Sequence, residues 1–162
     1  MKTLIVYASA HGTTEKVAHS IARSMDNGHV EIINLKKENP FDLSVYDRII
    51  VGGSIHAGQI QGRVKQFCEK NMLQLLEKQL GLFLCCMNEP EYQAQFERAF
   101  PELLRKHASS SKIMGGEFLF DKMNFFQRLI VRKISGINES VSKIDEKSLQ
   151  QFAKEMNPLK LN

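Results

Sequence analysis

Residues 3–25 read TLIVYASAHGTTEKVAHSIARSM, and this stretch decides the fold. Residues 3–7 form a continuous run of β-branched, aliphatic and aromatic side chains, which is typical of a strand buried on both faces of a parallel sheet. Apolar residues then recur at helical spacing from Val17 to Met25 and stop at Asn27-Gly28, a helix C-terminal signal. The stretch therefore predicts a strand, a short polar loop and a helix.

The same alternation continues along the chain. Further strands are predicted at residues 30–35, 48–52, 80–87 and 112–118. Helical spacing marks residues 64–75 and 96–104, and Pro101 breaks the second of these helices. Strands that alternate with helices imply right-handed crossovers and a doubly wound α/β sheet with helices on both faces. Five parallel strands predict the order 2-1-3-4-5, with a ligand at the carboxyl ends of strands one and three.

Composition places the chain among ordinary globular proteins. It has 162 residues, 43% of them hydrophobic, which favours one domain spanning residues 1–162. Its apolar runs are shorter than the roughly 20 residues of a membrane span, and its first residues lack a secretory signal, so we expect a cytoplasmic protein. Its 22 Lys and Arg against 18 Asp and Glu give a formal charge of +4, which suits an acidic partner or anionic lipid.

Cysteine and histidine spacing indicates neither a disulfide framework nor a metal site. Cys68, Cys85 and Cys86 are an odd number, and the two adjacent residues are poorly placed to bridge each other, so reduced thiols are expected. The chain contains neither Cys-x-x-Cys nor a histidine pair at helical spacing. We therefore predict no metal, and no nucleic-acid partner is expected.

The loop after the first strand has the chemistry of a phosphate site. Small hydroxylated residues let the backbone approach a ligand, glycine permits a tight turn, and the helix N-terminus adds its dipole. The loop has neither the Gly-Lys-Ser/Thr ending of a triphosphate site nor Gly-x-Gly-x-x-Gly, so a monophosphate fits better. The alternative is that its hydroxyl groups only cap the helix. The candidate residues are Ser9, Ala10, His11, Gly12, Thr13 and Thr14.

Residues 5–21 resemble the flavodoxin signature position by position, in the aromatic residue, the hydroxyls, the small residue, the threonine, the alanine and the terminal aliphatic. The resemblance implies a flavodoxin-like doubly wound five-stranded parallel sheet of order 2-1-3-4-5 and a loop that holds the phosphate of flavin mononucleotide (FMN). The stretch Gly52–Gln59 then faces the isoalloxazine ring, where backbone amides can bind its pyrimidine edge and N5. An ordinary turn is the alternative. The residues assigned to the cofactor in this loop are Gly53, Ser54, Ile55, His56, Ala57 and Gly58.

Two further assignments concern the second and third loops. His56 is the titratable side chain of the second loop and the one candidate for guiding a proton, although a passive exposed histidine is equally compatible. In the third loop, Met87 and Asn88 lie nearest the flavin position, and Tyr92 is the aromatic candidate. Tyr92 can instead begin the next helix and pack against the core.

An added basic amphipathic helix is predicted after the fifth strand, within residues 118–136. Met123, Phe126, Ile130 and Ile134 share a stripe, which either packs on the sheet or belongs to a helix that faces a membrane. In the second case cations beside an exposed phenylalanine suit an anionic leaflet on the inner face of the cell membrane. The cations concerned are Lys122, Arg128, Arg132 and Lys133.

The start of the chain, residues 52–55, residues 113–116 and the phenylalanine-rich basic helix ending at Ser135-Gly136 together resemble the menaquinone-dependent protoporphyrinogen IX dehydrogenase family. This resemblance implies an FMN enzyme that oxidises protoporphyrinogen IX to protoporphyrin IX for haem synthesis and passes electrons to a membrane quinone. A basic flavodoxin that only carries electrons is the alternative. A flavodoxin-like scaffold that has lost its cofactor is a third hypothesis.

Overall fold

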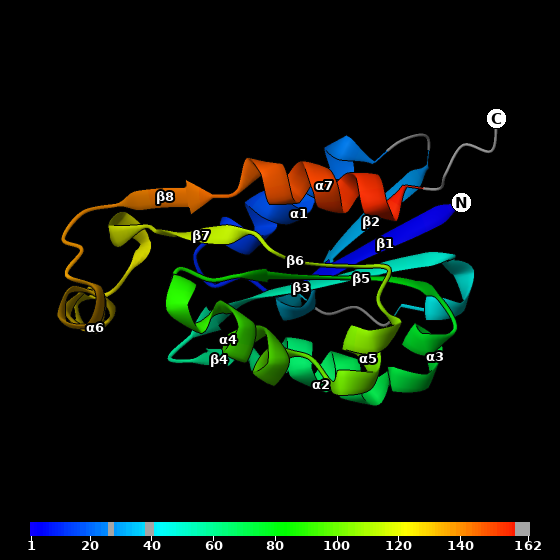
Figure 1. Ribbon diagram of the computed structural model, residues 1–162, viewed down its shortest axis with the longest axis horizontal. Coiled ribbons are helices and arrows are strands. Elements are labelled where there is room, and N and C mark those ends of the chain that lie inside the picture. Colours follow the sequence, from blue (N-terminus) through cyan, green and yellow to red (C-terminus); the bar gives the residue numbers. More distant parts are fainter. Residues whose placement is uncertain (26–27, 38–40, 158–162) are drawn as a thin grey trace.

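The computed structural model describes residues 1–25, 28–37 and 41–157, and a parallel sheet lies between two layers of helices (Figure 1). The strand order β2-β1-β3-β5-β6 confirms the predicted order 2-1-3-4-5, because the short β4 (Gln59–Ile60) pairs only with β3 and shifts the later numbers by one. The parallel strands are β1 (Lys2–Tyr7), β2 (His29–Asn34), β3 (Arg48–His56), β5 (Gln79–Cys85) and β6 (Ser110–Ile113).

Strand β1, an interior strand of the sheet, is buried on both faces, which explains its continuous apolar sequence. Leu4 and Val6 contribute to the core on one side of the sheet, whereas Ile5 and Tyr7 contribute to the core on the other side. This alternation follows from the two-residue period of a strand. The sheet therefore separates two hydrophobic cores, and its carboxyl ends form the edge where a ligand is expected.

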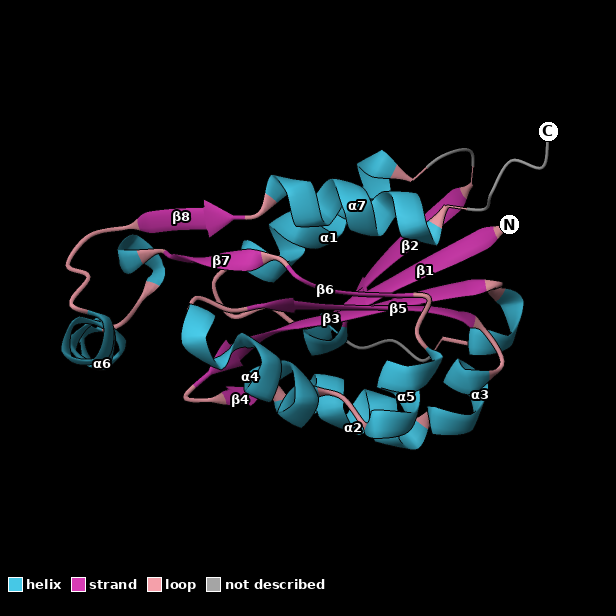
Figure 2. Cartoon of the chain, viewed as in Figure 1, coloured by secondary structure: helices cyan, strands magenta, loops and turns pink. Residues whose placement is uncertain are grey.

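Helices cover both faces of the sheet (Figure 2). One face carries α1 (Thr13–Ser24) and α7 (Glu146–Met156), and the other carries α2 (Gly62–Lys70), α3 (Met72–Leu76), α4 (Tyr92–Ala99) and α5 (Glu102–His107). The predicted break at Pro101 is confirmed, but the predicted helix over residues 64–75 is divided at Asn71. Helix α1 ends at Ser24, and Asn27 of its predicted end signal lies outside the described residues. Short 3-10 turns occupy Leu35–Lys37, Leu43–Val45 and Glu89–Glu91.

Helix α7 is an element that the sequence analysis did not predict. Asp145 caps it by accepting hydrogen bonds from the backbone N–H groups of Lys147 and Ser148, each at 3.0 Å. Its buried side chains approach β5 closely, because a Cβ at Gly81 would lie 2.7 Å from the Phe152 ring. The buried residues recur at helical spacing and are Leu149, Phe152, Ala153 and Met156.

The predicted fifth strand over residues 112–118 is wrong in its second half. Strand β6 ends at Ile113, and β7 (Gly115–Phe118) leaves the parallel sheet to pair antiparallel with β8 (Val141–Ile144). Gly115 makes this change of direction possible, since its φ is +66° and a Cβ there would collide with the carbonyl oxygen of Lys143. Its own carbonyl accepts a hydrogen bond from the N–H of Cys86 at 2.7 Å.

Residues 115–144 form an arm that projects beyond the end of the sheet, with α6 (Phe125–Ser135) at its tip (Figure 1). The arm consists of β7, the 3-10 turn η4 (Phe120–Lys122), α6 and β8. Asn124 and Gln127 form a capping box at the start of α6, which confirms a helix in the predicted segment. No residue of α6 is buried, so the alternative in which its apolar stripe packs on the sheet is wrong.

We predict that Gly115→Ala lowers the free energy of unfolding by at least about 2 kcal/mol, because it adds a backbone collision to the strain of a left-handed residue. Gly136→Ala is the matched control, since Gly136 has a φ of +69° but no described atom within 4 Å of the point where its Cβ would stand; its expected cost is about 1 kcal/mol. Urea unfolding measures both values. Equal losses would contradict the role of the Lys143 carbonyl.

Candidate functional site

The loop between β1 and α1 is shaped to receive an anion. Ser9 Oγ accepts a hydrogen bond from the N–H of Gly12 at 2.9 Å, which closes the turn. Gly12 has a φ of +99° and precedes the first residue of α1. The N–H groups of the first helical turn have no helical partners and carry the positive end of the helix dipole. A phosphate placed here would satisfy these donors.

Thr14 supplies the clearest sign that a ligand belongs in this loop. Its side chain is 1% exposed, and its Oγ1 is the one buried side-chain oxygen or nitrogen without a hydrogen-bond partner among the described residues. The neighbouring Cys85 thiol interacts with the Thr14 hydroxyl without a hydrogen bond of regular geometry. A buried hydroxyl with no partner costs free energy. The residues of this loop therefore fit the phosphate of FMN.

The second predicted loop is a β-hairpin, since β3 continues to His56 and returns through β4. Ala57 and Gly58 at its tip have φ values of 49° and 77°, the positive pair found in tight type I′ turns. Gln61 holds the base of the hairpin, because its Oε1 accepts the N–H of Ser54 at 2.8 Å and its Nε2 donates to Ser54 Oγ at 2.6 Å. The hairpin therefore presents backbone groups from a fixed position.

His56 connects the hairpin to the phosphate loop. Its Nε2 lies 3.1 Å from Ser54 Oγ, and its ring meets the His11 ring edge-on with centroids 5.8 Å apart. Although part of His56 is open to solvent, burial and the nearby His11 and Lys36 lower the pKa of His56. The imidazole is therefore neutral at pH 7, with one nitrogen able to donate and the other able to accept a proton.

The end of β5 brings two thiols to the site. Burial raises the pKa of Cys85 to about 12, and burial also raises the pKa of Cys86. The Cys86 thiol donates a hydrogen bond to Gln95 Oε1 of α4. Both thiols are therefore protonated at neutral pH and act as packing groups rather than nucleophiles.

The arm forms the wall opposite the hairpin. Glu117 of β7 has a side chain that is 5% exposed, accepts from Thr13 Oγ1 at 3.1 Å and from Ser142 Oγ at 2.8 Å, and pairs with Lys16 Nζ at 2.9 Å. Burial opposes ionisation of Glu117, but the Lys16, Ser142 and Thr13 hydrogen bonds lower its pKa overall. These bonds fasten β7 to the first turn of α1.

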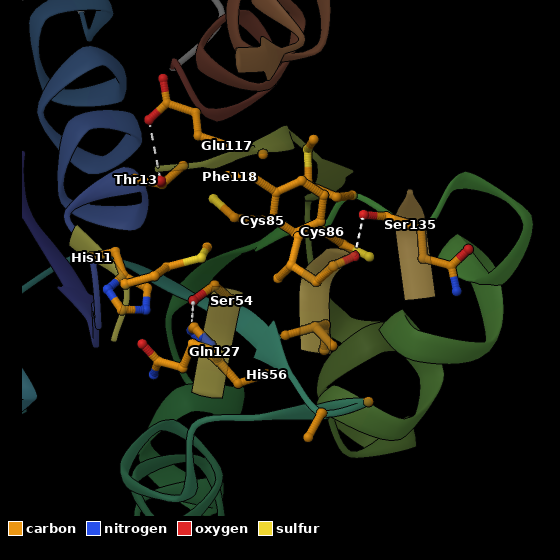
Figure 3. A pocket seen from close by; sticks show the side chains of 18 of the residues that line it. His11, Thr13, Ser54, His56, Cys85, Cys86, Glu117, Phe118, Gln127 and Ser135 are labelled. Carbon is orange, nitrogen blue, oxygen red and sulfur yellow. Dashed lines mark hydrogen bonds between the residues drawn. The ribbon is translucent and has the colours of Figure 1, made fainter. Parts of the chain in front are cut away.

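Side chains from all these segments converge on one cavity of about 410 Å³ at the carboxyl ends of β1, β3 and β5 (Figure 3). Its position is the switch between β1 and β3 that the strand order predicts. Most of the predicted site residues line it, namely Ser9, His11, Thr13, Thr14, Ser54, Ile55, His56, Ala57, Gly58, Met87 and Asn88.

Four predicted site residues do not line the cavity. Gly12 shapes the phosphate loop and Ala10 is exposed on it, whereas Gly53 lies within β3 against the side chains of Ile60 and Gln61. Tyr92 begins α4 and packs against the core, which is the alternative to its contact with a flavin. Asn88 and Met87 are therefore the residues that the third loop contributes.

The sequence analysis missed the contribution of the arm to this cavity. Its stripe of apolar residues was recognised, but spacing alone does not say which surface a helix meets. Gln95 and the two thiols carried no signal of their own. The missed lining residues are Cys85, Cys86, Gln95, Gly116, Glu117, Phe118, Met123, Gln127, Ile130, Val131, Ile134 and Ser135.

Comparison with known proteins decides the family. The model of the flavodoxin domain family matches residues 4–145, which covers most of the chain. The chain belongs to this family. The flavodoxin family binds FMN, and FMN is accordingly the cofactor of this protein, as its sequence predicts. When bound, FMN supplies reversible one- and two-electron chemistry at its isoalloxazine ring.

Individual relatives are distant. The protoporphyrinogen IX dehydrogenase [quinone] of Leishmania major is 22% identical over an alignment of 176 residues including gaps. The alignment covers 99% of this chain and 76% of that protein. Flavodoxin 1 from Bacillus cereus is 17% identical, with coverage of 96% and 97% of the two chains and a TM-score of 0.59. The flavodoxin of Streptococcus pneumonia TIGR4 is 19% identical, with the same coverage and a TM-score of 0.58. These structural similarities show the fold.

We predict that Thr14→Val weakens FMN binding about tenfold, because a hydrogen bond to a charged group contributes about 1.5–3 kcal/mol. The apoprotein should be at least as stable as the wild type, since the substitution removes a buried hydroxyl that has no partner. Flavin fluorescence titration and urea unfolding measure the two effects. Thr14→Ser is the matched control that retains the hydroxyl. Wild-type affinity in Thr14→Val would exclude this hydroxyl from the phosphate site.

We predict that the apoprotein loses stability as the pH falls below about 6.5, because the pKa of His56 is lowered in the folded protein relative to the unfolded chain. The unfolded chain then binds the proton that the folded imidazole resists. His56→Gln should show a smaller loss between pH 7.5 and pH 5 in urea unfolding. His107→Gln, a change at an exposed histidine away from the cavity, is the control. Identical pH profiles for wild type and His56→Gln would contradict the prediction.

Proposed function

We propose that this protein oxidises protoporphyrinogen IX to protoporphyrin IX and passes the electrons to a membrane quinone. The fold, the family and the cofactor make it an FMN-binding oxidoreductase or electron-transfer protein. The observation that carries the finer proposal is the arm, which adds an apolar helix to one side of the flavin cavity. The name of the Leishmania major relative supports the same reaction.

The arm side of the cavity suits a substrate that is mostly apolar. Helix α6 lines it with Ile130, Val131 and Ile134, while the hairpin on the other side offers backbone groups. Ile130 and Ile134 remain 56% and 80% exposed, so this wall has apolar surface available for a ligand. A porphyrinogen combines an apolar macrocycle with carboxylates, and a chain with a formal charge of +4 favours such an anion.

Three segments of the chain have separate roles in the proposed reaction. The Ser9–Thr14 loop holds the phosphate end of the cofactor, the hairpin tip orients the ring, and α6 excludes water from the substrate side. Each oxidation step removes two electrons and two protons from the porphyrinogen, and the quinone takes up the same number to leave as the quinol. Neutral His56, with Nε2 beside Ser54 Oγ, is the candidate to pass a proton at the cavity rim.

The outer face of α6 is proposed to meet the membrane. Phe125 and Phe126 are each 72% exposed and Leu129 is 52% exposed, and none of the three lines the cavity. Lys133 is exposed near its end. No helix in the described part of the chain is long and apolar enough to cross a bilayer. An amphipathic helix lying on the inner face of the cell membrane would bring the cavity close to a quinone.

Three of the four predicted membrane cations make contacts within the protein. Arg128 Nε donates to the carbonyl oxygens of Phe120 and Met123, at 2.7 and 3.1 Å, so it holds the arm together. Arg132 lies over the Phe120 ring, 5.7 Å from its centroid. Lys122 lies beside Gly12 of the phosphate loop. Of these four residues, Lys133 is therefore the clearest candidate for a lipid headgroup.

A second candidate function is that of a basic flavodoxin that carries electrons between proteins. The structural similarity to solved flavodoxins, which extends over 96% of the chain, favours this candidate. An anaerobic assay separates the two, with purified FMN-loaded protein, protoporphyrinogen IX and a menaquinone analogue in anionic vesicles. The proposed enzyme produces porphyrin fluorescence at a rate proportional to protein. If porphyrin fluorescence rises no faster with the protein than with free FMN alone, the proposed oxidation is excluded and the electron carrier is the candidate that stands.

We predict that the double change Phe125→Ser and Phe126→Ser lowers sedimentation with anionic vesicles several-fold, because it removes exposed aromatic surface from α6. Oxidation of protoporphyrinogen with a water-soluble quinone should remain, since both side chains lie outside the cavity lining. The matched control is the double change Leu73→Ser and Leu103→Ser, at exposed leucines of α3 and α5. Unchanged sedimentation would end the membrane assignment of α6 and leave the cavity assignment intact.

A further inference from the structure

Lys122 lies at an unusual place for a side chain of the arm. It ends the turn η4, and its Nζ is 3.3 Å from the point where a Cβ on Gly12 would stand. Gly12 is the residue immediately before α1, a helix of 12 residues. The ammonium group therefore lies against the backbone of the phosphate loop, next to the positive end of the helix dipole.

The ammonium group of Lys122, an exposed residue, and the partial positive charge of the helix N-terminus repel each other, and an anion between them would remove this repulsion. No carboxylate within the described residues pairs with Lys122. The nearby Glu117 carboxylate is already engaged by Lys16, Ser142 and Thr13. Thr14, an independent observation, lines the cavity beside this loop, and its buried Oγ1 has no hydrogen bond of regular geometry within the described residues. The loop and the lysine beside it thus bring together a cation, a helix N-terminus and a buried hydroxyl, which together match a phosphate dianion.

We propose that Lys122 is a phosphate-binding residue that the arm contributes to the flavin site. A phosphate bound in the loop would then hold the arm in place over the cavity. Hydrogen bonds between the main chain of η4 and two other parts of the arm would transmit the effect of a bound phosphate from Lys122 to the rest of the arm. The N–H of Phe120 donates to Ser140 Oγ at 3.0 Å, and the carbonyl oxygen of Phe120 accepts from Arg128 Nε at 2.7 Å. Fixing Lys122 therefore restrains both α6 and the segment leading to β8.

This inference rests on the cofactor and the arm, and not on the proposed substrate. Linkage requires that the coupling works in both directions. A phosphate that draws Lys122 to the loop stabilises the closed arm, and an arm that is held in place raises the affinity for the phosphate. FMN, which carries the phosphate, should therefore order the arm, whereas riboflavin, which has the same ring without a phosphate, should not.

Flavin titration of the full-length apoprotein tests the first half of the proposal. Lys122→Gln should weaken FMN binding about tenfold, equivalent to about 1.4 kcal/mol, and leave riboflavin binding within about twofold of the wild type. Lys122→Arg should restore most of the FMN affinity. Lys143→Gln, which removes the same charge from β8 of the same arm, is the matched control and should bind FMN as the wild type does. Equal weakening of FMN and riboflavin, or wild-type FMN affinity in Lys122→Gln, would overturn the proposal.

Hydrogen exchange of residues 119–136 tests the second half. FMN should slow exchange in this segment of the wild type, and riboflavin at saturation should not. In Lys122→Gln, saturating FMN should give no more protection than riboflavin. Equal protection by both flavins in the wild type would overturn the coupling. Because neither experiment contains porphyrinogen or quinone, their outcomes are independent of the proposed oxidation, which can fail while Lys122 still discriminates between the flavins.

Discussion

The positive end of α1 is the constraint on which the candidate site depends, because it favours an anion such as the phosphate of FMN. The loop between β1 and α1 turns through Gly12, whose φ is +99°, and the N–H groups of the first helical turn have no partners within the helix. Thr14 adds a buried hydroxyl that has no hydrogen bond of regular geometry within the described residues. Such a group costs stability. A phosphate bound in this loop would complete the hydrogen bonding of the fold at the same time as it completes the site.

The arm is the feature that distinguishes this chain from a plain five-stranded sheet with its helices. It begins where Gly115 turns the strand out of the parallel sheet, and Glu117 ties it back to α1 through Thr13 and Lys16. Helix α6 then stands at the cavity with no buried residue. Such a helix is held by its flanking strands and its caps rather than by a core. Its apolar side chains are consequently available to ligands and surfaces on two sides.

Much of the fold and of the candidate phosphate site could be predicted from the sequence because both are encoded locally. The apolar run before Ser9 and the helical spacing after Thr14 specify a strand, a loop and a helix, and the chemistry of the loop follows from its hydroxyls and glycine. The hairpin after Ser54 was expected only as a loop, because β4 has two residues and shows no period. Helix α7 had a readable signal in the Asp145 cap and in the spacing of its apolar residues.

The position of α6 could not be predicted in the same way. Its apolar stripe, which includes Ile130 and Ile134, is as suitable for a sheet as for a ligand cavity. What decides between them is the direction that the chain takes at Gly115. Gly115 and Gly116 indicate that the backbone can turn here, but they do not indicate in which direction it turns. The direction becomes fixed only when β8 pairs with β7, a contact between segments that are far apart along the chain.

The two cysteines at the end of β5 have a consequence for the lifetime of the protein. A redox cofactor that meets air generates peroxide, and peroxide attacks thiolates far faster than thiols. Burial keeps Cys85 protonated, with a pKa of about 12, and Cys86 also has a raised pKa and hydrogen-bonds to Gln95. The two sulfur atoms therefore border the cavity in the protonated form, which peroxide attacks slowly.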